Sequence, residues 1–158
     1  MAAFIKFDGI DGESKAKGNE KWSDLQSYSQ SMHRAGHEMT GTQRRRGSVH
    51  HADIQCMKVL DKSSPKIAEA VSMGKVFPKV EIALKTDYVN SGRETYLLYT
   101  LQNVLVTSYS ISGSADGTPS ENFSLNFEEI KMTYTEMDEK GSKKGNVDYE
   151  WKVQEGSK

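Results

Sequence analysis

Apolar and polar residues alternate along much of the chain, and this period of two is typical of half-buried β-strands. The alternation predicts strands at residues 2–7, 49–59, 80–84 and 147–153. Residues 94–111 are rich in β-branched and aromatic side chains, and the segment is long enough for one bent strand or two. The pattern therefore predicts a fold that is made mainly of strands.

Two further segments have weaker or mixed strand patterns. Residues 22–32 are polar, but they contain Trp22 and Tyr28, which can anchor a strand. The apolar residues of segment 123–127 lie at odd positions, whereas those of segment 130–134 lie at even positions. This change of parity near residues 128–129 predicts a bulge, or a strand that passes from one sheet surface to another.

One segment, residues 61–75, has the signals of a helix. Ser63 or Ser64 is placed to cap its N-terminus, and Pro65 lies near the first helical position. Gly74 ends a pattern of apolar residues at helical spacing, which are Ile67, Ala70 and Val71. We therefore expect a mainly β fold, an antiparallel β-barrel or a two-sheet sandwich, with one short flanking α-helix at about residues 64–73.

The composition limits the class of protein. The chain has 158 residues, of which 35% are apolar, and we expect a single domain that spans residues 1–158. No segment is apolar enough to cross a bilayer, and the first residues show no signal-peptide pattern. A single cysteine excludes an intramolecular disulfide and fits a chain made in a reducing compartment. The net charge of -1 gives the whole molecule no preference for nucleic acid.

The stretch QRRRGSVHHADIQC, residues 43–56, brings many reactive residue types together. Its arginines, Arg44, Arg45 and Arg46, end a long segment at about residues 32–47 that lacks apolar periodicity. We expect this segment to be a loop. Loops of such length in compact domains tend to be functional or disordered.

The histidines and the cysteine of this stretch lie in the predicted strand that follows the loop. In an extended strand His50 and His51 point to opposite faces, and Cys56 lies roughly 20 Å from His50. These side chains cannot bind one ion at zinc–ligand distances. We therefore expect no metal site here.

The sequence patterns do not support catalysis. Cys56 lies mid-strand beside apolar residues, where a small buried side chain is more common than a reactive thiolate. The chain has no G-x-S-x-G, G-x-G-x-x-G, phosphate-loop or H-E-x-x-H motif. We expect no catalytic residue and no cofactor.

The arginines and histidines form a local positive cluster that suits phosphate, but no interleaved aromatic residues accompany it for stacking on bases. A loop cluster of this kind more often pairs with acidic residues of a neighbouring subunit. The acidic candidates are Glu136, Asp138 and Glu139. We therefore interpret the cluster as an oligomer or stacking interface that comprises Arg44, Arg45, Arg46, His50 and His51.

Several segments, taken together and in order, resemble one known family. They are FIKFDGIDGES at the start, LDKSSPK before the predicted helix, NVLVTSYSISG, SLNFEEIKMTY and the terminal YEWKV. In these segments the chain is similar to Hcp, the haemolysin-coregulated protein family that forms the inner tube of bacterial type VI secretion systems. The matching segments run through nearly the whole length of the chain.

The resemblance implies a β-barrel subunit that forms hexameric rings, which stack into a tube. It implies export from the bacterial cytoplasm without a signal peptide, no catalytic centre and no membrane insertion. The implied partners are other copies of the chain, the spike protein at the tube tip, sheath and baseplate components, and small effector proteins in the ring lumen. In relatives a loop at the place of residues 32–47 contacts other subunits or rings, but here it carries Arg44–Arg46 and His37 and is more charged than theirs.

Two other interpretations remain open from the residues alone. One is a monomeric β-barrel module that binds a carbohydrate or an anionic ligand through Arg44, Arg45 and Arg46. The other is an enzyme that depends on Cys56. A strictly monomeric protein would favour the first, and loss of a measurable turnover on Cys56→Ser would favour the second.

Overall fold

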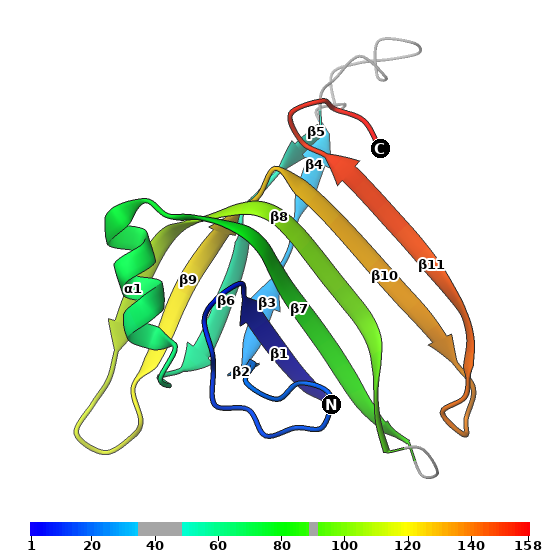
Figure 1. Ribbon diagram of the computed structural model, residues 1–158, viewed down its shortest axis with the longest axis horizontal. Coiled ribbons are helices and arrows are strands. Elements are labelled where there is room, and N and C mark those ends of the chain that lie inside the picture. Colours follow the sequence, from blue (N-terminus) through cyan, green and yellow to red (C-terminus); the bar gives the residue numbers. More distant parts are fainter. Residues whose placement is uncertain (35–48, 89–91) are drawn as a thin grey trace.

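The computed structural model describes residues 1–34, 49–88 and 92–158 (Figure 1). Within these residues strands dominate, and one helix, α1 (Ser64–Met73), lies on the flank of the sheet. This confirms the mainly β prediction; no helix of the described residues has the length and apolar content to cross a membrane. The strands are β1 (Ala2–Phe7), β2 (Ser23–Leu25), β3 (Ser27–Ser29), β4 (Met32–Arg34), β5 (Val49–His51), β6 (Ile54–Val59), β7 (Val76–Tyr88), β8 (Gly92–Ser112), β9 (Ser120–Asn126), β10 (Glu129–Met137) and β11 (Lys143–Lys152).

The main sheet closes on itself into a barrel. Its strands follow the order β2-β1-β7-β8-β9-β6-β3, so β2 and β3 lie at the two ends of this path. In the sequence, however, only Gln26 separates β2 from β3. The Gln26 N–H donates to the carbonyl oxygen of Met57 on β6 at 2.8 Å. Of the two predicted architectures, the barrel is therefore the one found.

Two predicted strands are divided. Segment 22–32 contains β2, β3 and the start of β4, and segment 49–59 contains β5 and β6 with Ala52 and Asp53 between them. Each piece pairs with a different strand: β2 with β1, β3 with β6, β4 with β5, and β6 also with β9. The prediction of one continuous strand is wrong in both places because a change of pairing partner turns the backbone, and alternation carries no information about partners.

The predicted loop at residues 32–47 lies only partly within the described chain. Its first residues, Met32–Arg34, form β4, so the loop prediction is wrong there. All three residues are exposed, so their pairing rests on backbone hydrogen bonds and leaves no apolar pattern in the sequence. Residues 35–48, which include Arg44, Arg45 and Arg46, lie outside the described residues.

The longest strand, β8, connects the barrel to a hairpin formed by β10 and β11. One edge of β8 pairs with β7, and the other edge pairs first with β10 and then with β9. Between these two partners Asn103 has a φ of 51°, and its Nδ2 donates to Glu128 Oε2 at 2.8 Å. The predicted parity change near residues 128–129 is confirmed as the place where the chain leaves the barrel and continues into the hairpin (Figure 1).

The barrel encloses an aromatic core that α1 helps to cover. The Phe7 ring contacts those of Phe77 and Phe123, with centroids 5.1 and 5.8 Å apart. The helix spans the predicted residues and ends at Gly74, whose φ of 66° favours glycine. Ser63 occupies the predicted N-cap position, but its side chain makes no hydrogen bond to the first turn of the helix. The position of the cap was therefore predicted correctly, and its hydrogen bond was not.

Candidate functional site

The strands β4 and β5 form a separate two-stranded sheet, here termed the arm, which lies beyond one end of the barrel (Figure 1). Its register places His33 opposite His50, and their ring centroids are 5.0 Å apart. His50 is exposed, whereas His51 turns toward Phe127 and Trp151 at centroid distances of 6.1 and 6.2 Å. The prediction that His50 and His51 diverge is therefore confirmed, and the arm separates a solvent-facing histidine pair from an inward-facing histidine.

His51 lies in a mostly apolar setting at the root of the arm. Both of its ring nitrogens, and the indole nitrogen of Trp151, are buried without a hydrogen-bond partner among the described residues. Burial, together with the neighbouring charge of His50, lowers the pKa of His51 below its usual value of 6.5. The neutral imidazole is therefore the form that fits this contact.

Cys56 has no catalytic environment. It is 3% exposed, and the register places it between Tyr28 and Phe123 on neighbouring strands. Burial raises the pKa of the Cys56 thiol to about 12. This burial confirms the prediction of a small buried side chain. A protonated and inaccessible thiol is also a poor nucleophile and a poor metal ligand.

The hairpin carries apolar rows that continue across β8. The register aligns each of three β8 residues with one residue of β10 and one of β11. Because residues directly opposite each other share a face, the three rows form one surface, here termed the apolar face. It comprises Leu101, Ile130 and Trp151, then Tyr99, Met132 and Tyr149, then Leu97, Tyr134 and Val147.

Cover over the apolar face decreases from the barrel toward the far end of the hairpin. Leu101 and Ile130 are 0% and 2% exposed, whereas Tyr134 and Val147 are 47% and 69% exposed. Tyr96 adds to the exposed end, with its ring 6.4 Å from that of Tyr134. Contiguous exposed apolar residues on a soluble protein mark a contact surface more often than chance.

The other face of the hairpin is polar, and its outer edge is open. On that face Lys131 pairs with Glu150 at 3.2 Å and lies 3.9 Å from Asp148. Among the described residues β11 pairs with β10, and on its outer edge only Lys152 is bridged, to Ser157, so the outer backbone groups of the rest of the strand are available to another chain. Sequence alternation predicted the apolar side of β11, but it could not show that this side lacks cover.

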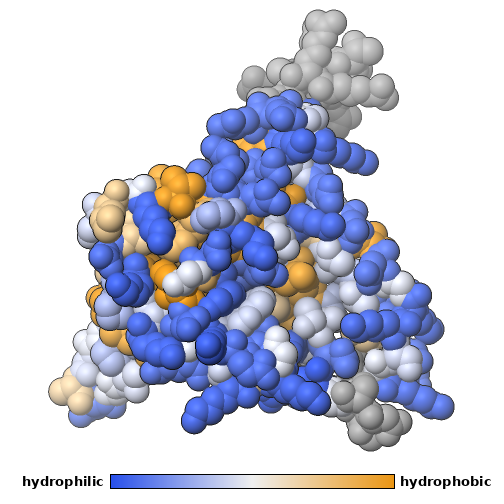
Figure 2. All heavy atoms as spheres, viewed as in Figure 1, coloured by the Kyte–Doolittle hydropathy of each residue, from blue (hydrophilic) through white to orange (hydrophobic). Residues whose placement is uncertain are grey.

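A second apolar patch lies at the opposite end of the molecule. Figure 2 shows hydrophobic residues gathered around α1, on the side away from β10 and β11. Met73 and Val76 are 71% and 53% exposed. Beside them is a groove of about 280 Å³ that Ile10, Lys66 and Lys75 help to line. Met73 and Val76, with the groove, are termed the helix patch below.

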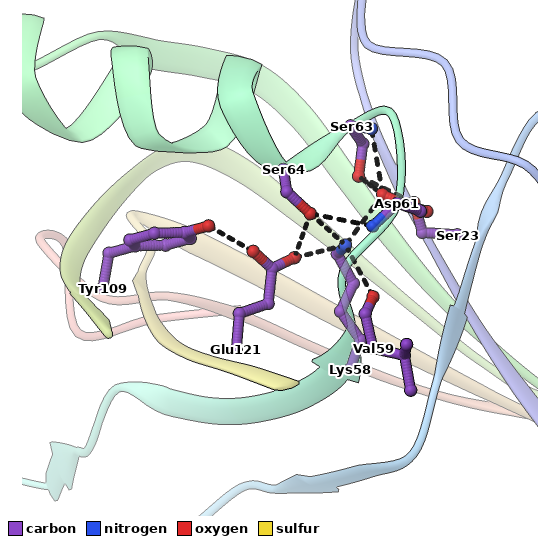
Figure 3. Close-up of polar contacts among 8 residues, drawn as sticks. All are labelled: Ser23, Lys58, Val59, Asp61, Ser63, Ser64, Tyr109 and Glu121. Atoms are coloured by element: carbon purple, nitrogen blue, oxygen red, sulfur yellow. Dashed lines mark hydrogen bonds and ion pairs between the residues drawn. The ribbon is translucent and has the colours of Figure 1, made fainter. Parts of the chain in front are cut away.

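A buried ion-pair cluster joins the start of α1 to the barrel (Figure 3). Lys58 of β6 and Glu121 of β9 are both 0% exposed and form an ion pair. The Lys58 Nζ also donates to Asp61 Oδ1 at 2.9 Å and to Ser64 Oγ at 3.2 Å. Ser64 Oγ donates to Glu121 Oε1 at 3.0 Å, and the Tyr109 hydroxyl donates to Glu121 Oε2. Both charges are therefore held by several partners.

The same cluster explains why Ser63 does not cap the helix. Its hydroxyl donates to Asp61 Oδ1 and lies 3.0 Å from Ser23 Oγ, so it is already engaged (Figure 3). Burial raises the pKa of the Asp61 carboxyl, but hydrogen bonds from Lys58 and the serines outweigh it and leave the pKa below its usual value. Burial, followed by the Glu121 carboxylate, raises the pKa of the Tyr109 hydroxyl. Asp61 is therefore ionised and Tyr109 protonated at neutral pH.

The ion-pair cluster has the residue types of acid–base chemistry but no access for a substrate. Lys58 and Glu121 are fully enclosed, and their charges neutralise each other. Sequence analysis missed the cluster, although one signal was present: Ile54, Cys56 and Lys58 alternate inward on β6, which places a lysine at a core position. The carboxylate that such a lysine requires is on β9 and cannot be identified from the local pattern.

Comparisons with known proteins agree on one family. The family model described as "Type VI secretion system effector, Hcp" matches residues 4–134. "Protein hcp1" of Pseudomonas aeruginosa is 32% identical over 157 residues, which cover 96% of this chain and 94% of that protein.

Solved structures resemble the whole described fold. A structure described as a type six secretion system protein has a TM-score of 0.90 at 25% identity and covers 99% of this chain and 98% of its own. Hcp1 from Salmonella typhimurium has a TM-score of 0.80 at 23% identity, and the match covers 99% of this chain and 97% of that chain. At that identity the similarity supports the fold alone.

Proposed function

Because the chain belongs to the Hcp family of type VI secretion tube proteins, we propose that it forms hexameric rings that stack into the tube and hold small effector proteins in their lumen. The family is one of structural secretion proteins, and self-association is part of its role. The observation that carries the ring proposal is the uncovered end of the apolar face around Tyr134 and Val147. A second copy of the chain covers it.

A closed ring needs two different surfaces on each subunit, because head-to-tail contacts repeat by rotation. The apolar face and the helix patch lie at opposite ends of the molecule, which suits such a contact (Figure 1). Val147 on one subunit then lies near Met73 or Val76 on the next. The open edge of β11 adds backbone groups to the same contact.

The stacking proposal concerns the arm. Its position beyond the barrel supports a role for His50 in contacts between rings, and the proposal extends this role to Arg44, Arg45 and Arg46, which lie between β4 and β5 in the sequence. His51 then holds the arm against Phe127 and Trp151. Acidic partners on the facing ring are Glu136, Asp138 and Glu139. Within the proposal, residues 1–158 act as one domain.

The remaining partners follow from the same proposal. The tube contacts a spike protein at its tip and sheath and baseplate components along its path, and the subunit is exported from the bacterial cytoplasm. No catalysis, cofactor or bound metal is needed for this role. The enclosed Lys58–Glu121 pair and the buried Cys56 thiol support a structural function.

The first experiment measures the assembly state of the purified protein. We expect a molar mass of six chains by light scattering and rings by negative-stain electron microscopy. A strictly monomeric chain at high concentration would contradict the proposal and favour the single-subunit binding module. A binding screen against carbohydrates and anions then tests that module.

Matched variants locate the contact. Val147→Glu places a charge on the apolar face, and we expect it to yield monomers, because burying an unpaired charge is costly. Asn146→Glu is the control, since it lies next to Val147 on the polar face, and we expect it to form rings.

A mixing experiment tests the pairing of the two surfaces. Met73→Glu changes the helix patch, and alone it should also yield monomers. A mixture of Met73→Glu and Val147→Glu leaves one intact contact per pair, so we expect dimers and no rings. Rings from Val147→Glu alone would show that the apolar face is not the contact.

A further inference from the structure

The geometry points to a metal-binding site on the arm: we propose that His33 and His50 together bind a divalent transition-metal ion such as Zn²⁺ or Ni²⁺. Both residues belong to one chain, so the site does not depend on ring assembly. Sequence reasoning tested His50 only against His51 and Cys56. The register of β4 and β5 instead supplies His33 as its partner.

The distance between the two rings fits a shared ion. A metal–nitrogen bond of 2.0–2.1 Å places the ion about 3.2 Å from each imidazole centroid, and a tetrahedral angle then separates the two centroids by about 5.2 Å. The observed separation is 5.0 Å, with the rings tilted by 52°. Two ligands on directly opposite strand positions therefore chelate one ion without movement of the backbone.

The surroundings leave the pair accessible. His33 and His50 are both exposed, so their rings can rotate to direct a nitrogen lone pair at a common point. Arg34 and His51, the adjacent positively charged or titratable side chains on the two strands, lie at alternate positions and so belong to the other side of the arm. A cation at the His33–His50 pair therefore avoids the nearest positive neighbours on these strands.

The donor set selects the class of ion. Imidazole nitrogen suits Zn²⁺, Ni²⁺ and Cu²⁺, whereas Ca²⁺ and Mg²⁺ require oxygen ligands. Among residues 1–34, 49–88 and 92–158, no group of three or more His, Cys, Asp or Glu residues is placed to hold an ion. The described residues therefore offer the two imidazoles alone, and the proposal needs no third protein ligand because water can occupy the other positions.

Isothermal titration of the untagged full-length chain with ZnCl₂ and with NiCl₂ tests the proposal. We expect one ion per chain, and a loss of affinity of at least about tenfold in both His33→Ala and His50→Ala, because a single imidazole has no chelating partner. Cys56→Ser is the control and should bind as the parent does, since its thiol is buried. A titration with CaCl₂ should show no binding.

Proton NMR of the histidine rings provides a readout that a folding defect does not imitate. Zn²⁺ should shift the ring signals of His33 and His50 in the parent protein and leave those of His51 in place. No uptake of either ion by the parent, or uptake that survives both alanine substitutions, would overturn the proposal. Shifts confined to other histidines would overturn it as well.

Discussion

Two regions differ in whether their side chains have partners within the chain. They are the ion-pair cluster beside α1, and the β10–β11 hairpin together with the arm. In the cluster, the charges of Lys58, Asp61 and Glu121 all find partners inside the same chain. At the hairpin, Tyr134 and Val147 remain uncovered, and His51 and Trp151 keep buried nitrogens without a partner among the described residues. The first region is complete by itself, whereas the second is suited to contact with another molecule.

Removing one charge from the cluster should destabilise the protein most. Lys58→Met leaves Glu121 buried without its cation, and we expect a loss of about 3–5 kcal/mol in the free energy of unfolding. Urea denaturation followed by tryptophan fluorescence measures it. Replacing both residues, as Lys58→Met with Glu121→Leu, should recover part of the loss, because the enclosed Glu121 charge is removed and only the Asp61 carboxylate then lacks its cation.

The exposed helix pair of Lys66 and Glu69 is the matched control for the cluster. Lys66 Nζ lies 3.3 Å from Glu69 Oε2, but both side chains are more than half exposed. Lys66→Met should therefore change the free energy of unfolding by less than about 1 kcal/mol. Equal losses for Lys58→Met and Lys66→Met would mean that burial of the cluster has no energetic consequence.

The root of the arm should respond to pH in a way that the cluster does not. Because the pKa of His51 is lowered on folding, the unfolded chain binds a proton more readily, and the stability from neutral His51 is present above pH 6.5 and is lost as the pH falls below it. The slope contributed by one histidine cannot exceed about 1.4 kcal/mol per pH unit. Thermal unfolding between pH 7.5 and 5.0 measures it.

Two variants assign this pH dependence. His51→Gln should flatten the curve below pH 6.5, because it removes the titrating group from the contact with Phe127 and Trp151. His50→Gln, one residue away on the exposed face of the arm, should leave most of the slope. A slope that is unchanged in His51→Gln would assign the titration to other groups.

A smaller effect should follow from changing the charge of residues 44–46. Replacing Arg44, Arg45 and Arg46 with Ser should weaken ring stacking more at low salt than at high salt, because exposed charges are screened within about 10 Å at 0.1 M salt. Sedimentation of the parent and the variant across a salt series measures the change. Stacking of the parent that does not depend on salt would remove the basis for this expectation.

Local signals predicted those elements that depend on local interactions. The helix bounds agree because Pro65 and Gly74 act through their own backbone, and the parity change near residues 128–129 marks a bend in the chain itself. The period of two also gave the apolar side of β10 and β11. These features need no knowledge of which strands are neighbours.

Features that depend on distant partners were missed. Lys58 requires Glu121, His33 requires His50, and the division of segment 22–32 requires separate pairing with β1, β5 and β6. In each case the second residue or strand lies outside the local segment, so no local pattern identifies it. The exposure of Val147 likewise depends on which other segments of the chain pack against it, and the local pattern does not contain this information.

The link at Gln26 has a consequence for how the chain folds. β1 and β2 are close in sequence, but β3 can pair only after β6 is in place, and β6 pairs with the much later β9. Contacts of such long sequence separation form slowly, because the intervening chain must first be ordered. The barrel therefore closes late, and until β3 pairs with β6 the free edge of β6 is exposed to other chains.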